Sequence, residues 1–131
     1  MTTSLSGGCS SLLVGDVSWS TPANGTSVCT SGIRTGQICR QIVTDASWEG
    51  IVGGVYVRHL AFIQSDQDGD GQYDCTTSLP GDSGGAVYQG MSGSTMVRAM
   101  GIITGGDSCS TLYTKLAGVK AWDSSVSMPL N

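Results

Sequence analysis

Glycine divides this chain into short runs, and that spacing restricts the folds open to it. Glycine accounts for 20 of the 131 residues, only 12% of residues are charged, and the mean hydropathy is +0.06. Frequent glycines without charged helical faces favour short strands joined by tight turns. Many short strands of this kind are typical of an antiparallel barrel or sandwich, and the pattern alone leaves both open.

Length and charge exclude several functions. A chain of this length forms one domain, or one half of a two-domain enzyme. The net charge of −4 leaves no basic patch to neutralise phosphates, so no nucleic-acid partner is expected. No apolar run reaches the length that crosses a bilayer, so no membrane partner is expected. Residues 1–10 lack the basic and apolar regions of a secretory signal peptide.

The five cysteines indicate an oxidising compartment and hence a secreted protein. Cys29 with Cys39, and Cys75 with Cys109, would form two local disulfides and leave Cys9 over. The loop-entropy estimate gives about 2.8 kcal/mol for the shorter bridge and about 3.8 kcal/mol for the longer one. The odd Cys9 indicates a free thiol, an intermolecular bridge, or a partner in sequence that is missing here.

The order of apolar runs predicts a tail followed by one domain. Residues 1–27 are rich in Ser, Thr and Gly and are predicted as a tail or linker, with one strand around Asp16–Trp19. Residues 28–131 are predicted as the domain itself. Within it, the segment 28–39 is predicted as a hairpin with cysteines near its ends, because Ser31-Gly32 and Thr35-Gly36 are turn signals.

The rest of the domain is predicted as strands with one terminal helix. Residues 41–44 continue as a strand, and 45–54 are expected to be a turn-rich connection. The longest strand is expected at 55–63, apolar on both faces and therefore central, with a further strand at 95–103 and a turn at Gly105-Gly106. Leucine and valine at helical spacing predict a helix over 113–126.

A glycine-rich turn is the first candidate for a catalytic site. Gly81-Asp82-Ser83-Gly84-Gly85 precedes an apolar strand-like run. Glycines permit backbone angles that let successive N–H groups converge in front of the Ser83 hydroxyl. That is the geometry of acyl transfer, in which preorganised donors face the oxyanion as its charge develops. A glycine-rich turn without function is the alternative interpretation of these five residues.

The turn resembles the GDSGG signature of chymotrypsin-like serine proteases, in the secreted streptogrisin and alpha-lytic protease branch. The resemblance extends in order over residues 28–126, through the cysteine-closed hairpin, the strand before the nucleophile, the second cysteine pair and the closing helix. It implies an all-β fold: a single antiparallel Greek-key barrel, the second half of the double barrel, with a short C-terminal helix. Ala86 stands where the family usually has proline.

The resemblance implies a role for each matching residue. Ser83 is the nucleophile, the N–H groups of Gly81 and Ser83 form the oxyanion hole, and Asp82 holds the loop by pairing with a new N-terminus or a local group. The residues Thr104, Gly105 and Gly106 would bind the backbone of a polypeptide substrate. Tyr73, Asp74 and Thr76 are candidates for the base of the specificity pocket, so the side-chain preference stays open.

The general base is missing from the matching segment. In this family the histidine and aspartate of the triad come from the first barrel, and only 27 residues precede the hairpin here. A serine without a base is a poor nucleophile at neutral pH. His59, the single histidine, lies mid-strand and is interpreted as a structural residue rather than a base. The chain is therefore expected to be inactive alone, with a first-barrel segment as its partner.

An acidic loop forms a second candidate site. Asp66, Asp68 and Asp70 alternate, Gly71 allows a sharp turn, and Gln72 and Asp74 follow, as in the first nine positions of an EF-hand calcium loop. Carboxylates this close repel one another unless a cation collects them. Thr77 stands where that loop has its bidentate glutamate, so a solvated Asp-Gly turn is the alternative. No cofactor is required, and calcium is the one candidate ion.

Three functions are compatible with these features. The first is the nucleophile-bearing half of a secreted serine endopeptidase. The second is a non-catalytic protease-like module that binds peptide, stabilised by calcium. The third is an assembly protein that uses the barrel as a scaffold, in which the seam left by the first barrel would support a homodimer.

Overall fold

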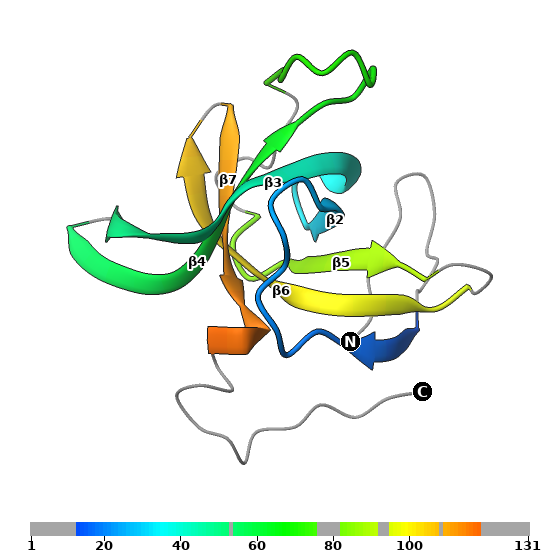
Figure 1. The fold of residues 1–131 in the computed structure, drawn as a ribbon, viewed down its shortest axis with the longest axis horizontal. Coiled ribbons are helices and arrows are strands. Elements are labelled where there is room, and N and C mark those ends of the chain that lie inside the picture. Colours follow the sequence, from blue (N-terminus) through cyan, green and yellow to red (C-terminus); the bar gives the residue numbers. More distant parts are fainter. Residues whose placement is uncertain (1–12, 53, 76–81, 92–94, 108, 119–131) are drawn as a thin grey trace.

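The computed structural model describes residues 13–52, 54–75, 82–91, 95–107 and 109–118, and these form an all-β fold (Figure 1). The seven strands are β1 (Val14–Val17), β2 (Ser27–Gly32), β3 (Gly36–Val52), β4 (Val55–Ser65), β5 (Ala86–Gly90), β6 (Val97–Asp107) and β7 (Ser110–Lys115). Among the described residues no helix is both long and apolar enough to cross a membrane.

The strands β2 to β7 close into a barrel. Their order is β6-β5-β2-β3-β4-β7, and β6 also pairs with β7. The hairpin-connected strands β2, β3 and β4 are followed by β5, which returns to lie beside β2, and that arrangement is a Greek key. The predicted antiparallel Greek-key barrel is therefore confirmed, and the sandwich alternative is excluded because β6 closes the sheet on itself.

Apolar side chains pack on both sides of the barrel wall. The interior cluster consists of Val28, Val43, Ala46, Ala61, Ile63, Val87, Met100, Ile103 and Tyr113. An outer cluster on β5 and β6 is covered by the N-terminal segment; its residues are Val14, Ala86, Tyr88, Val97, Ala99 and Leu116, with Val17, Trp19 and Cys29 packed against them. The N-terminal segment, predicted as a tail or linker, thus packs against the barrel through Val14, Val17 and Trp19.

The N-terminal strand lies slightly earlier than the sequence predicts. The prediction was a strand around Asp16–Trp19, and β1 runs from Val14 to Val17, parallel to β6. Asp16 accepts a hydrogen bond from Arg98 Nε of β6 at 2.8 Å. The next residue, Ser18, donates its N–H to Ala99 O at 2.9 Å.

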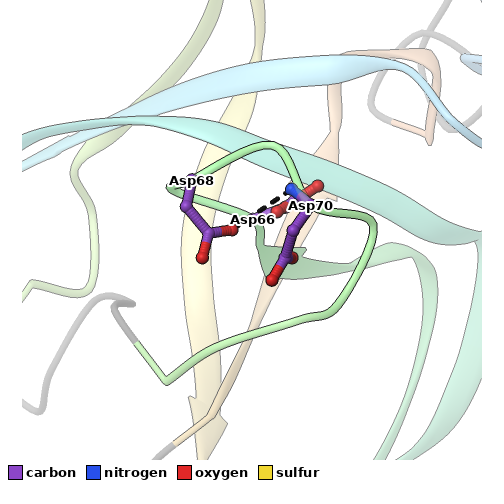
Figure 2. A group of neighbouring side chains, drawn as sticks. All are labelled: Asp66, Asp68 and Asp70. Atoms are coloured by element: carbon purple, nitrogen blue, oxygen red, sulfur yellow. Dashed lines mark hydrogen bonds between the residues drawn. The ribbon is translucent and has the colours of Figure 1, made fainter.

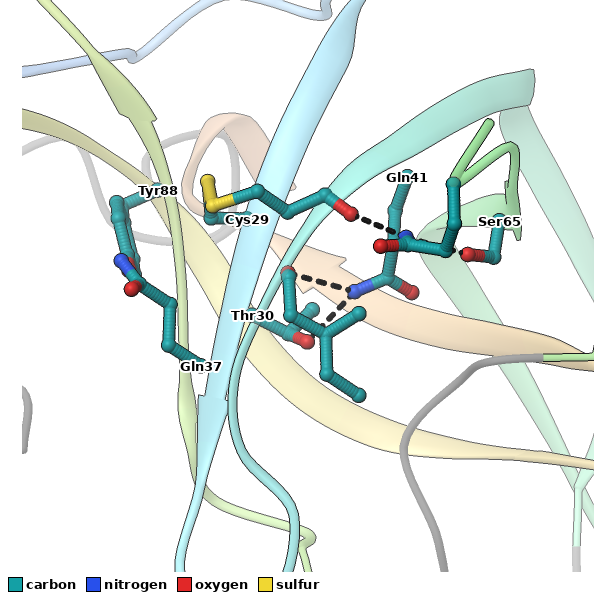
Figure 3. Close-up of a disulfide and its surroundings, with 9 residues drawn as sticks. Cys29, Thr30, Gln37, Gln41, Ser65 and Tyr88 are labelled. Atoms are coloured by element: carbon teal, nitrogen blue, oxygen red, sulfur yellow. Dashed lines mark hydrogen bonds between the residues drawn. A yellow bond between two sulfur atoms is a disulfide. The ribbon is translucent and has the colours of Figure 1, made fainter. Parts of the chain in front are cut away.

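Both predicted disulfides are present. Cys29 is bonded to Cys39 across the β2–β3 hairpin, and Cys75 is bonded to Cys109, which directly precedes β7. Figure 3 shows the first bridge beside the fully buried Gln41, whose Nε2 donates to Thr30 Oγ1 at 2.6 Å. Cys9 lies outside the described residues.

The predicted turn at 45–54 is wrong, because β3 continues to Val52. Pairing with β4 keeps the segment extended: Gly50 faces Val57 and Val52 faces Val55, with register shifts that absorb the irregular sequence. Trp48 packs on Gly50, where an added Cβ would lie 2.8 Å from the indole ring. The strand β3, with 17 residues, is therefore longer than β4, which the sequence predicted to be the longest.

The alternation of inward- and outward-facing residues along the strand β4 is interrupted at His59. His59 has a φ of 62°, in the left-handed region, so the alternation of faces predicted across it fails. Leu60 and Ala61 are consecutive and both buried, whereas Val55 is 61% exposed. The second half of β4 is central, between β3 and β7, as the apolar pattern predicts.

The C-terminal part of the barrel corrects two further predictions. Tyr113 to Lys115, predicted as the start of a helix, belong to β7, because these residues close the barrel against β4 and β6. Helical backbone begins at residue 116 and is described to 118; the remainder of the predicted helix lies outside the described residues. Gly105-Gly106, predicted as a turn, lies within β6.

Candidate active site

The turn that carries Ser83 is anchored by a buried carboxylate. Asp82 is 1% exposed. Its Oδ1 accepts the backbone N–H groups of Arg34 and Thr35 at 2.7 and 3.1 Å, and its Oδ2 accepts the Thr35 hydroxyl at 2.7 Å. Asp82 is thus held by the β2–β3 turn. Three donors offset the cost of burying the charge.

Glycine is required where the two turns meet. A Cβ on Gly32 would lie 2.3 Å from Asp82 Oδ1, and one on Gly85 would lie 2.3 Å from Ser31 O. Gly84 has a φ of 88°, which other residues rarely adopt. The close approach that lets Asp82 reach the β2–β3 turn therefore depends on these glycines.

The strand β6 fixes the other side of the turn. Gly84 N–H donates to Ile103 O at 2.8 Å, and Ile103 N–H donates to Gly85 O at 2.9 Å. Ser83 lies between these anchors and is exposed. A serine held on a rigid turn and open to solvent is the arrangement that a nucleophile needs.

The oxyanion hole is only half within the described part of the chain. Ser83 N–H belongs to the anchored turn, whereas Gly81 lies outside the described residues, as do Leu79 and Pro80. The assignment of Gly81 and Ser83 as oxyanion donors stays a prediction. Of the three specificity-pocket candidates, Tyr73 is 49% exposed and Thr76 is outside the described residues.

The residues predicted to bind substrate lie on β6 beside this turn. Thr104, Gly105 and Gly106 follow Ile103 directly, and Gly105 and Gly106 pair with β7. The pairing of β5 with β6 ends at Ile102, so among the described strands this stretch of β6 has a neighbour on one side alone. An open strand edge can pair with an extended peptide.

His59 lies elsewhere in the barrel. It is exposed on β4, and a Cβ on Gly118 would lie 2.2 Å from His59 Cβ. The Ser83 turn is instead held by the β2–β3 turn and by β6. The described contacts thus do not bring together the single histidine and the candidate nucleophile.

Three carboxylates of the acidic loop converge. One ligand oxygen each from Asp66, Asp68 and Asp70 can lie within 4.8 Å of the others (Figure 2). Asp66 is largely buried, and its oxygens accept the N–H groups of Gly69 and Gly71 at 3.1 and 3.3 Å. The Asp70 N–H group donates to Asp68, which holds the pKa of Asp68 below its usual value.

The other two predicted ligands stand at the edge of this loop. Gln72 donates its N–H to Asp70 Oδ1 at 2.8 Å, and Asp74 Oδ2 accepts the Gln67 N–H at 3.0 Å. Arg40 Nε donates to Asp66 O at 3.1 Å, so a cationic side chain already lies against the loop. The geometry is compatible with both interpretations of the loop, and calcium stays a prediction.

Sequence reasoning missed the residues that support Asp82. Thr35-Gly36 was interpreted as a turn signal alone, although the Thr35 hydroxyl donates a hydrogen bond to the Asp82 carboxylate. The signal that could have found it is the pairing of two glycine-rich turns around one buried acid. Such a contact spans 47 residues and has no periodicity in the sequence.

Comparison with known proteins decides the fold family. No protein-family model and no curated protein matches the sequence. Solved structures do match: a glutamic acid specific serine protease has a TM-score of 0.68 at 21% identity, covering 92% of this chain and 56% of that one. The fold is that of a chymotrypsin-like barrel.

Two further bacterial enzymes agree with this assignment. The chymotrypsin of Cellulomonas bogoriensis has a TM-score of 0.65 at 23% identity, covering 96% of this chain and 59% of that one. The Nocardiopsis protease has a TM-score of 0.64 at 24% identity, with 92% and 56% covered. This chymotrypsin-like barrel therefore spans little more than half the length of the proteases it resembles.

Proposed function

We propose that the chain is the nucleophile-bearing half of a secreted serine endopeptidase, with Ser83 attacking the peptide bond. The observation that carries the proposal is the anchored turn, in which Asp82 is held from the β2–β3 turn, Gly84 and Gly85 are held from β6, and Ser83 is exposed between them. A scaffold-only barrel would not require this convergence. The chymotrypsin-like fold and the open edge of β6 support the same function.

Catalysis requires a base that these residues do not supply. In the proposed mechanism, a histidine from a first-barrel segment removes the Ser83 proton while the serine oxygen attacks the carbonyl carbon of the substrate. The N–H groups of Gly81 and Ser83 stabilise the resulting oxyanion, and Thr104 to Gly106 align the substrate backbone. The amine then leaves with the proton from the histidine, and water releases the acyl group from Ser83.

A fluorophosphonate probe tests this proposal. The chain is labelled alone and after mixing with a separately expressed first barrel of a streptogrisin-like protease, with Ser83→Ala as the control. We expect labelling only in the mixture and none in the control. Labelling of the chain alone that disappears in His59→Ala would place the base within this chain and contradict the proposed division.

A second candidate is a non-catalytic module that binds peptide. The observation that favours it is that His59 lies on β4 beside Gly118, whereas the turn of Ser83 is held by other elements. In this function an extended peptide pairs with Thr104 to Gly106, and calcium at the acidic loop stabilises the module. Peptide binding that is equal in the parent chain and Ser83→Ala, without labelling in any mixture, would favour it.

Secretion is part of the proposal. Two disulfides are stable in an oxidising compartment. The structurally similar bacterial proteases support an extracellular location. Expression with and without disulfide formation, followed by thermal unfolding, measures how far folding depends on such a compartment.

A further inference from the structure

A two-stranded arm projects from the barrel. It consists of Glu49–Val52 on β3 and Val55–Arg58 on β4, which pair with each other (Figure 1). The pairing of β2 with β3 ends at Ile42, and the pairing of β7 with β4 ends at Leu60. Among the described strands, the arm therefore has no neighbour on either long edge, and its backbone groups there are open to another strand.

The arm gathers large apolar side chains that face water. Ile51 is 64% exposed, Val55 is 61% exposed and Tyr56 is 52% exposed. Ile51 and Tyr56 stand opposite each other in the register, so they form one continuous apolar surface. Strand edges that face only water are often protected by charges or proline, and the sequence has neither between Ile51 and Tyr56. An exposed apolar ribbon of this kind indicates an interaction surface.

The charges on the arm are balanced. Glu49 and Arg58 lie at its barrel end, and the Arg58 guanidinium lies 5.9 Å from the centre of the Tyr56 ring. Hydrogen bonding to Glu49 raises the pKa of Tyr56, so the Tyr56 hydroxyl is neutral at physiological pH. Because acid and base both flank the apolar surface, two copies of the arm do not repel each other, although the chain as a whole carries −4.

We propose that the arm is a dimerisation surface and that its occupant is a second copy of this chain. The two β4 edges pair antiparallel about a two-fold axis at Tyr56, which makes one four-stranded ribbon. Each Tyr56 then meets its own counterpart, an aromatic cross-strand pair. The two Arg58 side chains fall at opposite ends, so like charges stay apart. In this pairing, Arg58 of one copy lies opposite Gly54 of the other copy. An added Cβ on Gly54 would have no heavy atom within 4 Å, so there is room for the Arg58 side chain.

Dimerisation through the arm would also affect the open edge of β6, because Val52 of the arm lies beside Gly105 of β6. A Cβ on Gly105 would lie 3.4 Å from Val52 Cγ1, so the arm reaches the residues predicted to bind peptide. Pairing of two arms would hold the Val52 side chain in place beside Gly105. The inference does not depend on a proteolytic function, because it needs only the exposed surface and the free edges.

Sedimentation velocity of the whole 131-residue chain tests the proposal. The background is Cys9→Ser, which removes an intermolecular disulfide as a cause of association, and concentrations run from low micromolar to near millimolar. We expect a reversible dimer in this background and in Tyr56→Phe. In Tyr56→Lys two like charges meet at the axis, so the dissociation constant should rise by at least about tenfold.

The matched control is Ile33→Ser. Ile33 is 95% exposed on the β2–β3 turn, so it removes exposed apolar surface away from the arm, and the dimer should persist. Circular dichroism confirms that each variant is folded. A monomer at every concentration would overturn the proposal, as would a dimer that is unchanged in Tyr56→Lys or equally weakened in Ile33→Ser.

Discussion

The hydroxyl of Thr35 should contribute measurably to stability, because it is the side-chain donor to a buried carboxylate. Thr35→Val preserves the shape of the side chain and removes the bond to Asp82 Oδ2, which measures 2.7 Å. Asp82 is 1% exposed, so water cannot replace the lost donor without opening the turn. Hydrogen bonds to charged groups are worth about 1.5–3 kcal/mol, and we therefore expect a loss of about 2 kcal/mol.

Denaturant unfolding followed by tryptophan fluorescence measures this loss, and Thr35→Ser is the control. A loss of this size lowers Tm by roughly 6–10 °C for a domain of this length. Thr35→Ser restores the hydroxyl and should recover most of the stability. The reasoning is refuted when Thr35→Val unfolds within about 0.5 kcal/mol of the parent chain, or when Thr35→Ser loses as much as Thr35→Val.

Three further predictions follow from the charged groups. The hydrogen bond from Arg98 holds the pKa of Asp16 below its usual value, so the stabilising contribution is present at neutral pH and disappears as pH falls through the folded-state pKa. Stability curves of the parent chain and Asp16→Asn should therefore converge in acid. Burial lowers the pKa of Lys115, so the parent chain should gain stability relative to Lys115→Met as pH rises toward the unfolded-state value of about 10.4, which pH-dependent denaturation measures. Calcium should raise Tm in the parent chain and not in the Asp68→Asn, Asp70→Asn double variant; an equal rise in both, or none in the parent, contradicts a calcium site.

The features that sequence reasoning predicted correctly are local or carry a distinctive motif. The disulfide between Cys29 and Cys39 closes a short hairpin in which ten positions separate the two cysteines, so spacing alone favours it. The turn at Ser83 was predicted from the glycines that surround it, whereas the catalytic role of Ser83 stays a prediction. The contacts around this turn depend on the barrel fold, which brings the β2–β3 turn against the Asp82 carboxylate.

The wrong predictions fall where tertiary pairing overrides local preference. Residues 45–52 contain polar and glycine residues that favour a turn, yet pairing with β4 extends them into the arm. Tyr113 to Lys115 fit a helical spacing, but barrel closure requires them as a strand between β4 and β6. The bulge at His59 could not be anticipated, because a left-handed histidine in a strand has no signal in apolar alternation.

The parallel pairing of β1 with β6 has a consequence for the rate of folding. The hairpins β2–β3 and β3–β4 form from neighbouring residues, whereas Val14 must find Val97 across most of the chain. Contacts between distant residues form slowly because the loop between them must close first. Until β1 arrives, Val97, Ala99 and their neighbours on the outer face of the barrel stay in contact with water. We therefore expect that loss of β1 docking, for example in a chain lacking residues 1–17, would expose this apolar cluster and promote aggregation.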